Sequence, residues 1–261
     1  MEFKDKFDTF IMDWKTPVIS SFLYMAYVQY ENKRISQVTP PQRKKFSLLT
    51  LMMVLHNLIL CVFSGIVFYK TYNILLDCYK KSTFYNFLND GNKFLYKKMI
   101  FWTKLFYLSK YYEIIDTIIL HVNKKRTSFL QMYHHAGAII CCWMLAKCES
   151  HVPWIFVVLN SFVHTIMYAY YSLTCLGIKT KYKHLITKMQ MTQFVMGNIF
   201  ILIHIFKGDL LKNENIFTSF KVLALLSNVF YVAVLFGLFN QFSKQTYSKR
   251  IAERKKPIKN E

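Results

Sequence analysis

The sequence predicts an all-α integral membrane protein with seven transmembrane helices. More than half of the 261 residues are hydrophobic and 18% are aromatic, whereas Gly and Pro occur only 7 and 5 times. Apolar runs of about 20 residues recur with short basic breaks between them, as expected for helices that cross a bilayer. Residues 1–15 alternate charged and aromatic side chains without an apolar core, so we expect no cleavable signal peptide.

Seven apolar segments are expected to span the membrane, at about 16–31, 46–69, 99–120, 128–147, 153–174, 184–206 and 217–242. The first is short, and the third and sixth carry charges. Of the connecting segments, only 70–98 is long enough to hold a surface helix. We therefore expect one membrane domain at 16–242, preceded by a lumenal segment at 1–15 and followed by a basic cytosolic tail at 243–261.

The net charge of +20 is interpreted as loop charge rather than as a nucleic-acid surface, because Lys and Arg cluster between the apolar runs. The loops on the side of the C-terminus carry 18 of these residues, against 12 on the opposite side. Positively charged loops favour the cytosol, so the C-terminus is predicted to be cytosolic. The six cysteines show no CxxC spacing and are expected to be packing residues.

In the third span, Lys110, Glu113, Asp116 and Thr117 recur every three or four residues, so a continuous helix would place them on one stripe. A cation and two carboxylates at this spacing can neutralise one another. Polar contacts that tie helices together are the simpler alternative.

In the fourth span, Gln131, His134 and His135 share one helical face. Ionisable pairs are costly in hydrocarbon, so adjacent histidines indicate a functional site. A neutral imidazole can act as a nucleophile or general base near pH 7 without adding a permanent charge. The simpler alternative is a pair of histidines hydrogen-bonded into the core.

The fifth and sixth spans each present a further polar face. Asn160, His164, Tyr168 and Tyr171 share one face of the fifth span, although an aromatic stripe alone is more typical of a core. In the sixth span Thr187, Gln190 and Gln193 recur every three residues. Four consecutive spans with polar faces indicate a bundle around a polar reaction chamber that opens towards a basic cytosolic face.

A di-iron centre was the first alternative for the histidines. Such membrane oxygenases use about eight histidines in several clusters, whereas this chain has eight in total and only one adjacent pair. Ligand sets for other metals are also lacking in the sequence. We therefore predict no metal site.

The motifs carry a specific family resemblance over residues 15–250. The pattern KxxExxDT matches Lys110, Glu113, Asp116 and Thr117, and TxxQxxQF matches Thr187, Gln190, Gln193 and Phe194. The pattern NSxVHxxMYxYY matches Asn160, Ser161, Val163, His164, Met167, Tyr168, Tyr170 and Tyr171. With the basic turn Lys124-Lys125-Arg126, these motifs resemble the ELO family of very-long-chain fatty acid elongases. One difference is that Gln131 replaces the first histidine of the family's HxxHH box.

The resemblance implies six helices in an inverted barrel-like bundle around the chamber, and a seventh outside it. It also implies a 3-oxoacyl-CoA synthase of the endoplasmic reticulum, which condenses acyl-CoA with malonyl-CoA and releases CO2 and CoA. No bound cofactor or metal is implied. Expected partners are membrane lipid and the ketoacyl reductase, dehydratase and enoyl reductase of the elongation cycle, and a homodimer is one oligomeric state that the resemblance allows.

Residue roles follow as hypotheses from the residues and the resemblance. His134 would attack the acyl thioester, while His135, Gln131 and Asp116 would orient its ring and stabilise the oxyanion. His164 and Asn160 would position malonyl-CoA or stabilise its enolate. The remaining polar residues would bind substrate, with the basic ones attracting CoA phosphates: Lys110, Glu113, Thr117, Lys124, Lys125, Arg126, Tyr168, Tyr171, Thr187, Gln190 and Gln193.

Two other classes of protein compete with this interpretation. A non-catalytic lipid-binding or transport protein on the same fold would need the polar faces but no turnover. A seven-helix receptor would not need three stacked polar motifs with adjacent histidines. Lengthening of acyl chains that depends on malonyl-CoA separates the enzyme from both.

Overall fold

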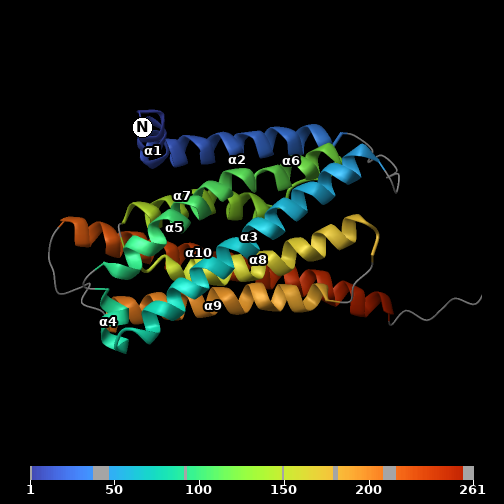
Figure 1. Ribbon diagram of the computed structural model, residues 1–261. Helices are drawn as coiled ribbons and strands as arrows, with labels where there is room; N and C mark the ends of the chain where they lie inside the picture. The colour runs from blue at the N-terminus through green and yellow to red at the C-terminus, as the bar shows by residue number, and fades with distance from the viewer. Residues whose placement is uncertain are drawn as a thin grey trace, which may run out of the picture.

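The computed structural model describes residues 2–37, 47–90, 93–148, 150–178, 182–207 and 216–254, and within these ranges it contains helices and no strands (Figure 1). The helices are α1 (Glu2–Met12), α2 (Lys15–Ile35), α3 (Leu48–Lys80), α4 (Phe84–Asn89), α5 (Phe94–Tyr112), α6 (Ile115–Val122), α7 (Phe129–Lys147), α8 (Trp154–Cys175), α9 (Lys183–Lys207) and α10 (Ile216–Arg254). The expected loops 32–45, 175–183 and 207–216 and the tail 243–261 lie partly outside the described residues.

Short polar residues set where several helices begin. The Ser47 hydroxyl accepts the amide of Thr50 at the start of α3, and Ser128 accepts that of Gln131 at the start of α7. The Asp90 carboxylate accepts two amides of the first turn of α5. Each of these contacts satisfies an amide that has no partner within its own helix.

Six elements pack in a closed order around the interior. α3 lies against α8 and α5, α5 against α7, α7 against α10, α10 against α9, and α9 against α8. α2 packs on α7 and α6 from outside this ring, and α1 contacts α2 near the N-terminus (Figure 1). The ring contains the fourth to sixth expected spans and, as α5, the first part of the third.

Much of the surface is apolar, as expected for a protein surrounded by lipid, and the interior holds buried polar residues among apolar ones. Large apolar side chains of α3 are exposed, among them Leu51, Leu55 and Val62, while His56 and Asn57 of the same helix are buried. The four helices α3, α8, α9 and α10 (over Phe220–Thr246) are long and apolar enough to cross a membrane. The chain is therefore a multi-pass membrane protein. The helices α2 (21 residues), α5 and α7 (19 residues each) are long enough to cross but are not sufficiently apolar or free of charge.

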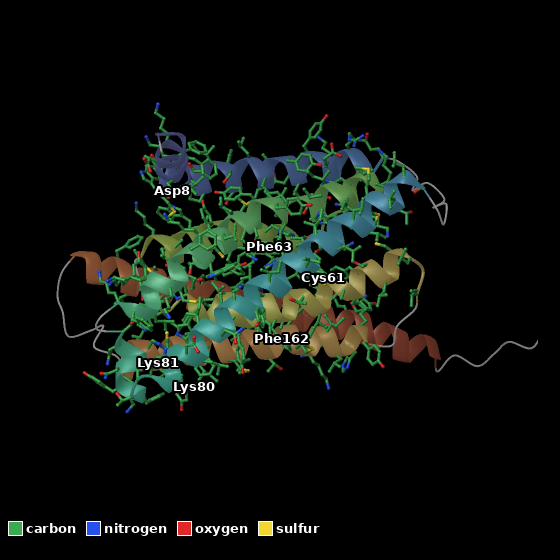
Figure 2. All side chains as sticks on the ribbon, viewed as in Figure 1. Asp8, Cys61, Phe63, Lys80, Lys81 and Phe162 are labelled. Carbon is green, nitrogen blue, oxygen red and sulfur yellow. The ribbon has the colours of Figure 1, made fainter. Side chains whose placement is uncertain are left out.

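The structure corrects several expected boundaries. The expected third span, 99–120, is not continuous, because α5 ends at Tyr112 and α6 begins at Ile115. α3 continues beyond residue 69 to Lys80, and α10 continues beyond residue 242 to Arg254. The N-terminal segment contains a helix, α1, that apolarity alone did not indicate. The segment 70–98, judged long enough to hold a surface helix, contains the short helix α4, which follows Lys80 and Lys81 at the end of α3 (Figure 2).

Candidate active site

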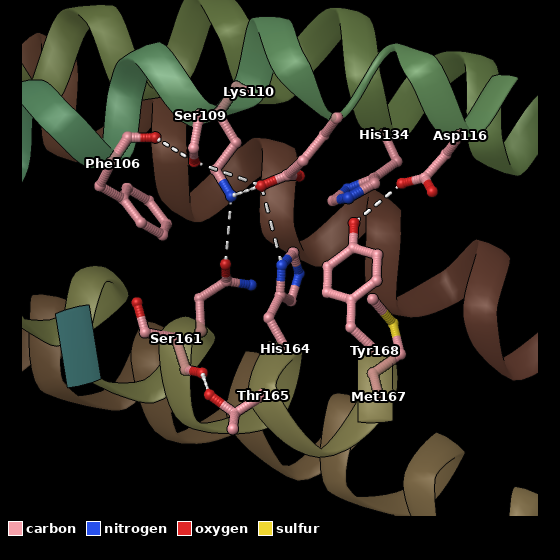
Figure 3. A network of polar contacts seen from close by, with 12 residues as sticks. Phe106, Ser109, Lys110, Asp116, His134, Ser161, His164, Thr165, Met167 and Tyr168 are labelled. Atoms are coloured by element: carbon pink, nitrogen blue, oxygen red, sulfur yellow. Dashed lines mark hydrogen bonds and ion pairs between the residues drawn. The ribbon is translucent and has the colours of Figure 1, made fainter. Parts of the chain in front are cut away.

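A buried ion pair lies at the end of α5. Lys110 Nζ lies 2.7 Å from Glu113 Oε1, and both side chains are less than 5% exposed. Lys110 Nζ also donates to Asn160 Oδ1 of α8 at 3.3 Å, and Ser109 Oγ donates to Glu113 Oε1 at 3.3 Å (Figure 3). A buried carboxylate is tolerated only with such compensation. The i,i+3 pairing expected between Lys110 and Glu113 is present.

The chain tightens where the ion pair ends. Backbone amides of Asp116 and Thr117 donate to the carbonyls of Glu113 and Ile114 respectively, each three residues back. Such contacts replace the i→i−4 ladder of an α-helix. Asp116 and Thr117 are consequently part of α6, and the single stripe expected from Lys110 to Thr117 is wrong as a description of one helix.

Asp116 makes contacts with α3 and α8. His56 Nε2 lies 3.0 Å from its Oδ1, and the Tyr168 hydroxyl donates to its Oδ2 at 2.8 Å (Figure 3). Its described hydrogen bonds therefore go to these two residues, and the role expected for it in orienting His134 finds no direct contact among them. His56 was not predicted as a site residue.

Thr117 joins three elements. Its hydroxyl lies 2.9 Å from the Tyr24 hydroxyl of α2 and accepts Gln131 Nε2 of α7 at 3.2 Å. Gln131 thus stands beside α6, one turn before His134, and its amide is held by a fully buried threonine. This arrangement links the start of α7 to the polar motif of α6.

His134 is held from α10 by a residue that the sequence analysis missed. His134 Nδ1 lies 3.2 Å from the Tyr231 hydroxyl, and that hydroxyl donates to the backbone carbonyl of His134 at 2.9 Å. The His135 ring lies 5.2 Å from the His134 ring, centroid to centroid, and it makes a T-shaped contact with the Tyr24 ring at 6.0 Å. Tyr231 had no signal in the sequence, since it is one aromatic residue in an apolar span.

His134, His164 and Glu113 converge from three helical segments. His164 Nδ1 lies 3.8 Å from Glu113 Oε1, and one ligand atom from each of the three residues lies within 4.8 Å of the other two. Such a set could hold a metal ion, which the sequence did not predict. However, the Lys110 ammonium is already 2.7 Å from the Glu113 carboxylate and would repel a further cation.

A narrow cavity of about 50 Å³ begins at these residues. Its polar lining comes from Lys110, His134, Asn160, Gln193, Asn228 and Tyr231. The rest is apolar and includes Cys141, Cys142 and Leu145, which lie further along α7. The cysteines expected to be packing residues therefore border the cavity, whose lining combines these apolar side chains with the polar ones.

The polar residues of α9 and the last turns of α8 divide between cavity and packing. Gln193 lines the cavity, and Gln190 Nε2 lies 3.2 Å from Met167 Sδ. The Thr187 hydroxyl donates to a carbonyl of its own helix at 3.2 Å. Tyr171 is 40% exposed and packs against Tyr168 with ring centroids 6.1 Å apart.

The basic turn between α6 and α7 is fastened to α2. The Asn32 amide donates to the Thr127 carbonyl at 2.9 Å, and its oxygen accepts the Thr127 amide at 2.8 Å. Lys124 is half-buried with a positive φ of 54°, and Lys125 and Arg126 are exposed. These cations lie about 10 Å along the helix from Thr117, at one end of the bundle.

Two further residues escaped prediction for the same reason as Tyr231. Tyr24 contacts Thr117 from α2, and buried Asn228 of α10 donates to the Ala224 carbonyl at 2.9 Å beside the cavity. Neither belongs to a periodic polar face. His56 did carry a signal, because it is an imidazole inside an apolar run and directly precedes Asn57.

The fold and this site define a multi-pass membrane protein with a buried polar site, and comparison with known proteins identifies its family. The chain belongs to the ELO (GNS1/SUR4) family, whose model matches residues 9–256. It is 31% identical to fatty acid elongase A of Dictyostelium discoideum over 92% of this chain and 86% of that protein. It is 30% identical to fatty acid elongase sre1 of the same organism, over 80% of this chain and 78% of that protein. Very long chain fatty acid elongase 4 of Trypanosoma cruzi is also 30% identical, over 90% and 84% respectively.

Proposed function

We propose that this fatty acid elongase is the condensing enzyme, which converts a long-chain acyl-CoA and malonyl-CoA into 3-oxoacyl-CoA, CO2 and CoA. The observation that carries this proposal is the position of His134. It lies near His164 and Glu113, and it lines the same cavity as Lys110 and a set of apolar side chains. A thioester carbonyl in this cavity would meet an imidazole, and its hydrocarbon tail would lie against the apolar side chains of the lining.

In the first half of the reaction, His134 attacks the acyl-CoA carbonyl carbon. The tetrahedral adduct collapses by breaking the C–S bond, CoA leaves as its thiolate and the acyl group stays on the imidazole. The developing oxyanion needs preorganised donors. The Lys110 ammonium lines the cavity and could serve as one such donor. His135 and Gln131 lie on the same helix as His134, α7.

In the second half, malonyl-CoA loses CO2 and its enolate attacks the acyl carbonyl, which frees His134. His164 and Asn160 lie on α8 beside Glu113 and Lys110 respectively, where they would hold the malonyl group. Support comes from Asn160, since it accepts a hydrogen bond from Lys110 and also borders the cavity. Asp116, held by His56 and Tyr168, would keep α6 and α8 at fixed separation.

The remaining predicted residues would bind the two ends of the substrate. Lys124, Lys125 and Arg126 would attract CoA phosphates at the end of the bundle. Cys141, Cys142 and Leu145 would face the acyl chain, because they line the apolar part of the cavity. In the present conformation that cavity holds only a few water molecules, so substrate entry would displace side chains.

The proposal includes a membrane arrangement. Seven spans within residues 16–242 would cross the endoplasmic reticulum membrane, with six around the chamber, residues 1–15 in the lumen and residues 243–261 in the cytosol. Support comes from Figure 1, where the last turns of α2, α6, α8 and α10 and the first turns of α3 and α9 lie at one end of the bundle. The reaction needs no bound cofactor, and its 3-oxoacyl product requires a ketoacyl reductase, a dehydratase and an enoyl reductase to follow.

The direct test is elongation by membranes from elongase-deficient cells that express this chain. The wild type should convert acyl-CoA into a 3-oxoacyl-CoA two carbons longer only when malonyl-CoA is present. His134→Ala should abolish both this product and the release of CoA from acyl-CoA alone. Release of CoA by His134→Ala at the wild-type rate would show that another residue is the nucleophile, and no lengthening by the wild type would favour a non-catalytic lipid-binding protein.

A further inference from the structure

Tyr231 makes two contacts with one histidine, and together they determine where that histidine carries its proton. The phenol hydroxyl has a single hydrogen, which it donates to the His134 backbone carbonyl at 2.9 Å. A carbonyl oxygen can only accept, so this direction is fixed. The remaining contact, 3.2 Å from His134 Nδ1, can then form only if Nδ1–H donates to the phenol oxygen.

We infer that Tyr231 is a positioning residue that holds His134 in the Nδ1–H tautomer and leaves the Nε2 lone pair free for nucleophilic attack. In neutral imidazole one nitrogen is a donor and the other an acceptor, and the hydrogen bond at one nitrogen selects the state of the other. This role rests on the proposed function, since it assigns the attacking atom of His134.

The glycine that follows one turn later on α7 supports this role independently. A side-chain carbon added at Gly137 would overlap the Tyr231 ring. Glycine at this position therefore allows the phenol to lie across the α7 backbone, close enough to reach both atoms of His134. By contrast, an added carbon at Gly237, on α10 itself, would meet no atom within 4 Å.

The surroundings of the ring agree with a fixed orientation. The Tyr231 ring stacks on that of Tyr133, with centroids 5.4 Å apart and planes 27° apart. Both Tyr231 and His134 border the cavity, and Tyr231 reaches His134 from α10. Packing therefore holds the phenol in place, and its hydroxyl selects the Nδ1–H tautomer of His134.

With this tautomer the acylation step balances without another base. The Nε2 lone pair forms the N–C bond to the acyl carbon, and the C–S bond breaks with its electron pair going to the CoA thiolate. Nδ1 keeps its proton, which stays hydrogen-bonded to the Tyr231 oxygen, so the acylated ring is an imidazolium. The thiolate takes a proton from water. Attack by the malonyl-derived enolate then returns a neutral Nδ1–H imidazole as the acyl group leaves.

The test is the rate of CoA release when the purified chain meets acyl-CoA without malonyl-CoA. Tyr231→Phe keeps the ring and removes the hydroxyl, and we expect it to slow release at least tenfold with an unchanged KM for acyl-CoA. Tyr133→Phe removes a hydroxyl from the same ring stack without touching His134, and it should release CoA at the wild-type rate. A role confined to packing would affect both variants alike.

A second pair of variants tests the same role without altering the phenol. Gly137→Ala should push Tyr231 from His134 and slow CoA release as Tyr231→Phe does, while Gly237→Ala should not. Both changes break the same contact, that between the Tyr231 hydroxyl and His134. Adding Tyr231→Phe to Gly137→Ala should therefore cause no further loss in the rate of CoA release. Release by Tyr231→Phe within twofold of wild type would overturn this inference alone, whereas absence of release by the wild type would overturn the acyl-imidazole route on which it rests.

Discussion

The buried Lys110–Glu113 pair gives the sharpest prediction about what holds the site together. Its atoms lie 2.7 Å apart, so their direct attraction is about 6 kcal/mol at an effective dielectric constant of about 20. Much of this attraction offsets the cost of removing both charges from water. Lys110→Met leaves the carboxylate with only the Ser109 hydroxyl as a close donor, so we expect a loss of about 3–5 kcal/mol of stability.

A double-mutant cycle on this pair also needs Glu113→Gln and the variant that carries both changes. Glu113→Gln leaves the Lys110 ammonium without its counter-ion, and it should lower the stability of the protein by a similar amount. The double variant carries no buried charge, and it should be more stable than either single variant although still inactive. Thermal unfolding in detergent micelles measures all four proteins. Single variants that unfold at the wild-type temperature, or a double variant whose loss is the sum of the two, would refute the coupling of this pair.

Three further predictions concern contacts around the site. Gln131→His should leave elongation activity within about tenfold of wild type, or about 1.4 kcal/mol of barrier, in assays of 3-oxoacyl-CoA formation. Asn32→Ala removes both hydrogen bonds to Thr127, so the KM for both CoA substrates should rise several-fold with little change in kcat. Tyr168→Phe removes a 2.8 Å hydrogen bond to Asp116 and should cost about 1–3 kcal/mol of stability.

Each of these has a result that contradicts it. A loss or gain well beyond tenfold in Gln131→His would give that position a role not assigned to it. If Asn32→Ala changed kcat and left KM as it was, the basic turn would not bind CoA. A Tyr168→Phe variant as stable as wild type would mean that Asp116 is satisfied by His56 alone.

The sequence allowed the membrane class and the sets of polar residues to be predicted, because both depend on local pattern. The Lys110–Glu113 pair lies within one helical turn, so spacing alone was sufficient to predict it. The cavity position of His134 and Asn160 also followed from their helical faces, since each shares a face with other polar residues.

The features that were missed depend on packing between distant segments. Tyr231 and Tyr24 are isolated aromatic residues in apolar spans, and only the approach of α10 and α2 gives them a polar partner. The break between α5 and α6 could not be predicted from a Gly or Pro, since the segment from Tyr112 to Ile115 contains neither. Asp116 faces His56 as a consequence of that break, so its partner could not be read from periodicity.

The most direct test of the central claim is a search for an acyl group on His134. The purified chain is mixed with acyl-CoA alone, quenched rapidly and digested, and the peptide that contains His134 is analysed by mass spectrometry. We predict one acyl group per chain on that residue, an equal amount of free CoA, and disappearance of the adduct as 3-oxoacyl-CoA forms when malonyl-CoA is added. Release of CoA only in the presence of malonyl-CoA, with no adduct at any time, would contradict the account.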